Sequence, residues 1–204
     1  MSNQNIIFPL KEQDTSFIKS AEIKYHQHRV FLDKDIDDPS EYRELIDLLF
    51  SASEMDEIQI FINSVGGQLR TAQAIIEGIK LTQANVTGII IGDCHSAASM
   101  IALYCHNVMV LDSASMMIHT AYTGSEGIVS NMQTYSSFLQ NKVEKLLHET
   151  YDGFLTKEEI EKVKLGIEIW LDAEEIRKRY EGRIKFLDKK YKQLEKKTAT
   201  AKNK

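Results

Sequence analysis

Two small-residue turns and one histidine are the residues of this 204-residue chain that could do chemistry together. The turns are residues 63–67 (NSVGG) and 92–96 (GDCHS), and each follows an apolar run. A turn from a strand into a helix presents backbone N–H groups where the helix dipole favours negative charge. Such a place can hold a phosphate or the oxyanion of an acyl-transfer intermediate.

Ser96 closes the second turn. A serine at a strand-to-helix turn is well placed as a nucleophile, because its hydroxyl projects from the sheet and the next N–H can donate to an oxyanion. The G-x-S-x-G pattern of α/β-hydrolases is absent, and a serine here also fits a helix N-cap. Position alone leaves both interpretations open.

A nucleophilic serine needs a base, and His119 is the best placed of the six histidines. It ends the apolar run 116–119 (MMIH) and precedes a glycine-bearing loop, although it also fits a satisfied polar group at a strand edge. The rivals are His26 and His28 in a polar lead-in, His148 on a predicted helix, and His95 and His106, which flank the predicted serine helix. No group of them has convincing metal-ligand spacing, so we predict neither a metal nor a cofactor.

Alternating strands and helices must position these residues. Apolar, β-branched runs predict strands at residues 29–32, 57–62, 86–91, 108–111 and 116–118. Apolar spacings of three and four predict helices at residues 39–50, 69–81, 96–104, 128–151, 156–163 and 172–180. The order predicts an α/β fold with a mainly parallel sheet of repeated βα units, whose strand ends bring the two turns together.

Three motifs in order resemble the ClpP family, the proteolytic subunit of Clp protease. Residues 62–67 (INSVGG) resemble its I-N-S-P-G-G turn, and residues 92–96 resemble its G-x-A-[AS]-S turn. Residues 117–119 (MIH) resemble its M-I-H strand end, 23 residues after Ser96. The likeness covers about residues 29–182 and is greatest for phage-encoded ClpP-like proteases. It implies a ClpP/crotonase-like fold with a long protruding handle helix, here residues 128–151.

The resemblance implies a role for each residue at the strand ends. Ser96 would be the nucleophile, His119 the general base and acid, and the N–H groups of Gly67 and Ala97 the oxyanion donors. Ser99 competes with Ser96, because residues 97–100 (AASM) match a family string, but it would lie one helical turn deeper. The substrate backbone would pair with Gly66, Ala121, Tyr122, Thr123 and Gly124.

Glu168 is the counterpart of the family's catalytic aspartate, two residues before Trp170. A glutamate can orient an imidazole as an aspartate does. Asp172 is the fallback, although it better suits the N-cap of the last helix. A plain solvent-exposed acid is the other interpretation of Glu168.

The resemblance implies an ATP-dependent, Clp-type serine endopeptidase that cleaves unfolded polypeptides or peptides through an acyl-enzyme. The handle helix implies a homo-oligomer, with rings of about seven stacked in pairs. An AAA+ unfoldase partner is left open. Three alternatives remain: a phage head-maturation protease, a crotonase-fold enzyme acting on acyl-CoA, and a non-catalytic ClpP-like scaffold subunit.

Charge divides the chain unevenly. Residues 177–204 carry 12 Lys or Arg and 3 Asp or Glu, a charge of +9, whereas the other 176 residues carry 13 and 27, a charge of −14. We therefore predict an arm at residues 1–22, a protease domain at 23–183 and a basic tail at 184–204. The tail could contact an acidic partner, or be a solvated helix end with a frayed terminus. Nucleic acid is not expected, because few aromatic residues interrupt the tail.

Cysteine and apolar content indicate the compartment. Two cysteines are too few for a disulfide-stapled domain, and no apolar run reaches the roughly 18 residues that span a membrane. Residues 1–11 lack a signal-peptide pattern. We therefore expect no membrane partner and a cytoplasmic location, which would be the host cytoplasm for a phage-encoded protein.

Overall fold

The computed structural model describes residues 25–121 and 129–202, and structural statements below refer to those ranges. The predicted arm at residues 1–22 lies outside them. The strands are β1 (Gln27–Leu32), β2 (Glu57–Ser64), β3 (Asn85–His95), β4 (Asn107–Val110), β5 (Ser115–Ile118) and β6 (Ile169–Asp172). The helices are α1 (Arg43–Ser51), α2 (Leu69–Leu81), α3 (Ala97–Tyr104), α4 (Val129–Tyr151), α5 (Lys157–Lys164) and α6 (Ala173–Lys202), with a 3-10 turn at Pro39–Tyr42.

The strands form one sheet in the order β1-β2-β3-β5-β6, and β4 also pairs with β3. All pairings are parallel except β5 with β6. Strand β3 is long enough to serve two neighbours, because residues 87–90 pair with β4 and residues 93–95 pair with β5. The prediction of an α/β fold with a mainly parallel sheet is confirmed.

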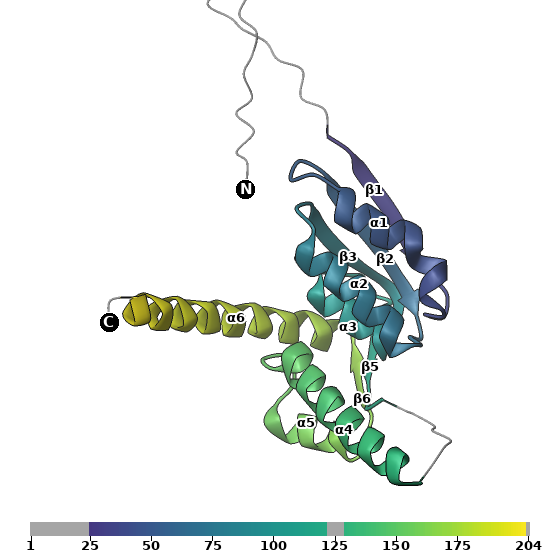
Figure 1. Cartoon of the computed structure of the whole chain (residues 1–204). Helices are drawn as coiled ribbons and strands as arrows, with labels where there is room; N and C mark the ends of the chain where they lie inside the picture. Colours follow the sequence, from purple (N-terminus) through teal and green to yellow (C-terminus); the bar gives the residue numbers. More distant parts are fainter. Residues whose placement is uncertain (1–24, 122–128, 203–204) are drawn as a thin grey trace, which may run out of the picture.

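Helices α1, α2 and α3 cover one face of the sheet (Figure 1). Burial alternates along β2, where Ile58, Ile60 and Ile62 are fully buried on the helix side. On the opposite face the Phe31 and Phe61 rings stack with centroids 5.1 Å apart, and Phe31 is 60% exposed. The far side of the sheet is therefore an open, partly apolar surface.

Helices α4 and α5 form a pair at the end of the sheet that carries β5 and β6 (Figure 1). Tyr151 and Leu147 at the end of α4 belong to the hydrophobic core. Helix α5 begins with a capping box, in which Thr156 and Glu159 satisfy each other's backbone N–H groups. Glu159 also forms two hydrogen bonds to the Arg179 guanidinium, at 2.8 and 2.9 Å, so α5 is tied to α6.

The structure differs from the predicted elements in three places. Strand β3 continues through residues 92–95, which were predicted as a turn, because residues 93–95 pair with β5. Strand β6 was not predicted, since it has only three apolar residues and its partner β5 is more than 50 residues away in the chain. Helix α6 is 30 residues long and crosses the predicted domain boundary at residue 183 without a break. Residues 184–202 contain good helix formers and no proline or glycine, which favours this extension over a frayed tail.

Within the described ranges, no helix combines the length and the apolar character needed to cross a bilayer.

Candidate active site

Ser96 is held in a strained backbone conformation between β3 and α3. Its φ of 52° makes it the one non-glycine residue of the described ranges with positive φ, a conformation that costs about 1–3 kcal/mol. The Ser96 N–H donates to the Met117 carbonyl at 2.7 Å. The Ser96 carbonyl accepts from the Ser99 N–H at 3.0 Å and from Ser99 Oγ at 2.7 Å. These bonds fix the turn and direct the Ser96 hydroxyl outward.

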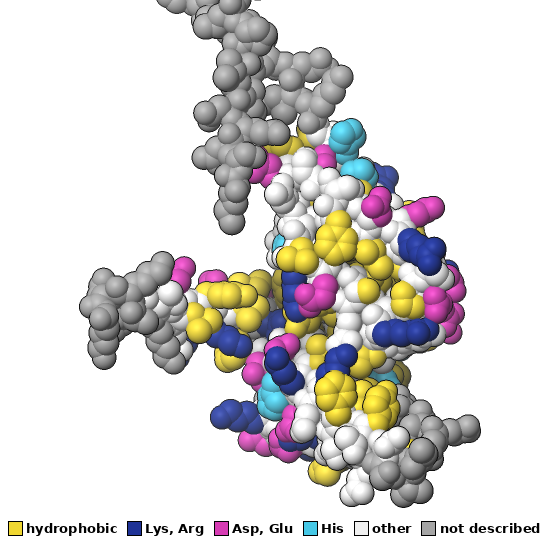
Figure 2. Space-filling model, in the orientation of Figure 1, with side chains coloured by type: hydrophobic (Ala, Val, Ile, Leu, Met, Phe, Trp, Pro, Cys, Tyr) yellow, Lys and Arg dark blue, Asp and Glu magenta, His cyan; other side chains and the backbone are white. Residues whose placement is uncertain are grey.

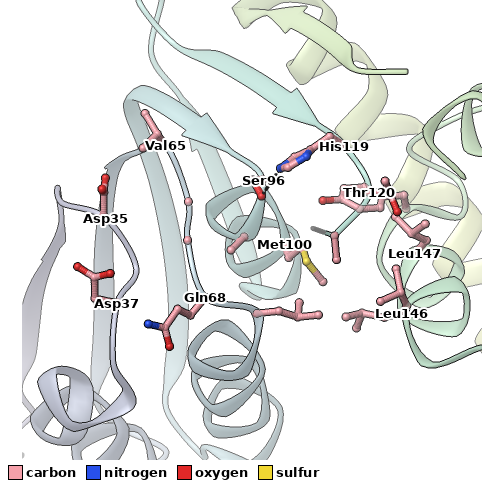
Figure 3. Close-up of a pocket in the computed structure, with 17 residues that line it drawn as sticks. Asp35, Asp37, Val65, Gln68, Ser96, Met100, His119, Thr120, Leu146 and Leu147 are labelled. Atoms are coloured by element: carbon pink, nitrogen blue, oxygen red, sulfur yellow. Dashed lines mark hydrogen bonds between the residues drawn. The ribbon is translucent and has the colours of Figure 1, made fainter. Parts of the chain in front are cut away.

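His119 follows β5, the strand beside the end of β3, so its imidazole meets the serine turn. His119 Nε2 lies 2.7 Å from Ser96 Oγ, which is hydrogen-bond distance (Figure 3). A hydroxyl and an imidazole in this contact are the nucleophile and base arrangement of acyl transfer.

The glycine turn after β2 presses against the serine turn. A Cβ at Gly66 would lie 2.8 Å from Ser96 Cβ and 2.9 Å from the Ala97 nitrogen, so only glycine fits. The Gly66 carbonyl accepts from the Ile36 N–H at 2.8 Å, and the Gln68 N–H donates to the Ile36 carbonyl at 2.6 Å. Because an extended backbone alternates, the Gly67 N–H points away from Ile36. Gly67 and Ala97, the first residue of α3, line the same cavity as Ser96.

A cavity of about 500 Å³ joins these groups. Its wall includes all the predicted site residues of the two turns and the strand end that the structure describes: Gly66, Gly67, Ser96, Ala97, His119 and Ala121. Met100, Leu146 and Leu147 form an apolar side, whereas Asp35 and Asp37 lie at the other end (Figure 3). The predicted substrate residues Tyr122, Thr123 and Gly124 lie outside the described residues.

Glu168 lies next to His119 in the sheet register but is bound elsewhere. The antiparallel register of β5 and β6 ends at the pair Ile118 with Ile169, and His119 and Glu168 are the adjoining residues of the two chain segments. The Glu168 carboxylate accepts a hydrogen bond from Trp170 Nε1 at 2.9 Å, and it does not line the cavity.

Asp172, the fallback acid, caps α6. Its Oδ1 accepts from the Glu175 N–H at 2.9 Å, as expected for an N-cap. It pairs with Ser115 at the opposite end of β5 from His119, which removes it from the reach of that imidazole.

The rival residues have structural contacts. Ser99 is fully buried, and its hydroxyl lies 2.7 Å from the Tyr151 hydroxyl. His106 Nδ1 accepts from the Val86 N–H at 3.0 Å. Burial raises the pKa of the Cys94 thiol, so the cysteine near Ser96 is not a competing nucleophile at neutral pH.

His95 belongs to a polar cluster that the sequence did not reveal. Its Nε2 lies 2.9 Å from Ser115 Oγ, which in turn donates to the Asp93 carboxylate at 3.0 Å. The His95 ring meets the Trp170 indole edge to face, with centroids 5.1 Å apart. Only the pairing of β3, β5 and β6 brings these residues together, so no local signal could have found the cluster.

One group in the described ranges has spacing that could suit a metal, namely His26, His28 and Asp56. It lies at the amino ends of β1 and β2, away from Ser96. Asp56 already accepts hydrogen bonds from the N–H groups of Ser53 and His26, which lower its pKa. Through these bonds Asp56 stabilises the turn before β2.

The fold and the site define a class: a mainly parallel α/β protein with a serine–histidine pair and a glycine turn at the strand ends. Comparison with known proteins agrees. The Clp protease family model matches residues 12–180, and the chain belongs to that family. It is a protease of the ClpP type.

Two curated relatives carry the same family name. ATP-dependent Clp protease proteolytic subunit 2 of Bacillus licheniformis is 28% identical over 158 residues, which are 72% of this chain and 79% of the relative. The protein of that name from Borreliella burgdorferi is 28% identical over 141 residues, 67% of this chain and 70% of the relative.

Proposed function

We propose that this protein is a serine endopeptidase that hydrolyses unfolded polypeptides or peptides through an acyl-enzyme on Ser96. The observation that carries the proposal is the 2.7 Å contact between Ser96 Oγ and His119 Nε2 beside the N–H groups of Gly67 and Ala97. A crotonase-type acyl-CoA enzyme does not need this serine–histidine pair.

The reaction follows from the positions of these groups. His119 Nε2 takes the hydroxyl proton while Ser96 Oγ bonds to the scissile carbonyl carbon. The Gly67 and Ala97 N–H groups stabilise the resulting oxyanion, and each such donor is worth about 3–4 kcal/mol in comparable sites. The C–N bond breaks as His119 protonates the leaving amine, and water then repeats the sequence to release the acyl group.

We propose that Glu168 orients His119 and stabilises its imidazolium. The two residues follow and precede the last pair of the β5–β6 register, and a change of the Glu168 side-chain rotamer from Trp170 toward His119 would complete the triad. Substrate binding would favour that change, because the imidazolium forms only during turnover.

Met100, Leu146 and Leu147 support a preference for an apolar substrate side chain next to the cleaved bond. The extended backbone at Gly67 would pair with an extended substrate, which favours unfolded chains over folded ones. We therefore propose that an ATP-driven unfoldase supplies folded substrates, so that peptide cleavage alone would not need ATP.

We propose a homo-oligomer, with rings of about seven stacked in pairs. The open face of the sheet, with exposed Phe31 and Met109, supports burial against another subunit. This size is what the family resemblance implies.

Labelling with a fluorophosphonate followed by peptide mapping tests the hydrolase. We expect the label on Ser96, its loss in His119→Ala, and its retention in Ser99→Ala. Ser96→Ala should lower peptide cleavage by at least about 10⁴-fold. Label on Ser99 would overturn the assignment, and no label on a folded, assembled protein would favour a scaffold subunit.

A further inference from the structure

Contacts along the first half of helix α6 anchor it to the rest of the described chain. Arg177 donates to the Val110 carbonyl through Nε and Nη2, at 3.1 and 2.9 Å, and Arg183 Nη1 donates to the Asp152 carbonyl at 3.1 Å. The Phe186 ring lies so close to Gly153 that a Cβ there would be 2.5 Å from Phe186 Cγ. Beyond this point the helix projects away from the sheet and from α4 and α5 (Figure 1).

The projecting part carries apolar residues on one narrow stripe. Ile184, Leu187, Tyr191 and Leu194 follow each other at steps of three, four and three residues, and we call them the α6 seam. Ile184 is 45% exposed, Tyr191 62% and Leu194 50%, and Figure 2 shows hydrophobic side chains along this helix. Apolar residues at alternating steps of three and four mark the a and d positions of a coiled coil, which pack against a partner helix.

The charges beside the α6 seam are sorted by sign. With Ile184 and Tyr191 at a and Leu187 and Leu194 at d, the e positions hold Asp188 and Glu195. Lys190 occupies the g position between them. In a parallel pair of such helices, each g residue faces the e residue five positions later on the partner. Lys190 of each copy would therefore face Glu195 of the other, so that two opposite-charge pairs form.

An antiparallel pair would bring g against g and e against e, which places like charges together. Along the length of the α6 seam, Lys185, Lys189, Lys192 and Lys196 occupy the outer b and f positions. The b and f positions face water in a parallel pair, so the positive charge of these four lysines does not oppose pairing at the α6 seam.

We propose that the α6 seam is the docking surface for the α6 seam of a second copy of this chain, in a parallel, in-register coiled coil. The a and d spacing supplies the apolar contact, and the g and e charges select the same sequence as partner. A seam of four apolar residues is short, so contacts between the bodies of the copies would support it by raising the effective concentration. The proposal does not depend on the chemistry of Ser96.

A disulfide experiment in the full chain tests the register. Leu194→Cys places a thiol at d, where two parallel helices bring the Cα atoms within the about 7 Å that a disulfide needs. Gln193→Cys, one residue earlier at c, is the matched control, because c faces solvent. Because the native Cys94 and Cys105 are buried, only the introduced thiol is accessible for a disulfide between copies.

Under mild oxidation, we expect Leu194→Cys to give a covalent dimer on a denaturing, non-reducing gel, at least tenfold faster than Gln193→Cys. Equal rates for the two variants, or no dimer from Leu194→Cys, would overturn the proposal. Circular dichroism and thermal melting equal to those of the parent chain show that each variant is folded.

A charge exchange then tests the identity of the partner, with Leu194→Cys as the reporter in every sample. Lys190→Glu places glutamate against Glu195, and Glu195→Lys places lysine against Lys190, so each variant alone should cross-link about fivefold more slowly. Mixing the two variants restores both opposite-charge pairs and should restore the rate as mixed dimers. Unchanged rates in all samples, or no recovery on mixing, would rule out this homotypic pairing.

Discussion

Ser96 is strained before any substrate arrives. Hydrogen bonds to Met117 and Ser99 maintain its positive φ, and these contacts of the folded state keep the hydroxyl toward His119. A serine in the ordinary N-cap conformation would instead bond to its own helix, and no such side-chain cap bond is present at Ser96. The N-cap interpretation of this residue therefore explains less of its geometry than the nucleophile interpretation.

Glu168→Gln tests the third member of the proposed triad. We expect kcat for a short peptide to fall by at least about 100-fold with little change in KM, because the imidazolium loses its stabilising charge. Asp172→Asn is the matched control, and it should keep kcat while the cap of α6 stays intact. Steady-state kinetics on both variants make the comparison, and near-normal turnover in Glu168→Gln would assign that residue to the contact with Trp170 alone.

The turn at Gly66 and Gly67 is the element on which the oxyanion site depends. A Cβ at Gly67, whose φ is +148°, would lie 2.2 Å from the Ile36 carbonyl oxygen. We expect Gly67→Ala to shift the turn and lower kcat by about 100-fold, the loss seen when one oxyanion donor is removed.

Gly166→Ala provides the control for backbone strain alone. Gly166 has a φ of +86°, but a Cβ there would meet no atom within 4 Å. This change should cost about 1 kcal/mol of stability and leave kcat unaltered. Thermal melting and peptide kinetics separate the two effects, and an equal loss of kcat in both variants would argue against a specific role for the Gly67 turn.

The link between α5 and α6 makes stability depend on pH. The Arg179 guanidinium lowers the pKa of Glu159 to about 2 from its ordinary 4.5. Because its pKa is lower in the folded state, the Glu159 carboxylate contributes its full stabilisation of the folded protein above pH 4.5. This stabilisation is lost as the pH falls toward 2.

We therefore expect Glu159→Gln to lower the free energy of unfolding at pH 7 by about 2–3 kcal/mol. The difference from the parent chain should shrink between pH 4.5 and 2, as measured by urea unfolding at several pH values. A difference that stays constant over that range would show that Glu159 acts through its capping box rather than through its charge.

In the molecule as a whole, the first half of α6 packs on the body that carries the cavity, and its second half projects from that body. The family match ends at residue 180, and no residue of α6 lines the cavity in the described part of the chain. The excess of positive charge thus belongs to a projecting helix and has no direct bearing on what the cavity accepts.

Ending the chain after Asp188 tests this division. The contacts of Arg177 and Arg183 remain, so we expect thermal stability and kcat/KM for a short peptide to stay within about twofold of the parent values. Association between copies, measured by analytical ultracentrifugation, should weaken because half of the α6 seam is gone. Loss of peptide cleavage in a folded, truncated protein would contradict the separation.

The sequence by itself predicted the mainly parallel α/β fold, because apolar runs and small-residue turns can be read from neighbouring residues. Three motifs in order, which resemble the ClpP family, selected Ser96 and His119 as the candidate nucleophile and base. The tertiary structure decided that Asp172 lies at the far end of β5 from His119 and Glu168 at the near end, because β6 is specified by pairing with β5 rather than by its own three apolar residues. It also decided the conformation of the basic region, which is a projecting part of α6. A charge count cannot show that this helix leaves the sheet and exposes a stripe of apolar residues to solvent.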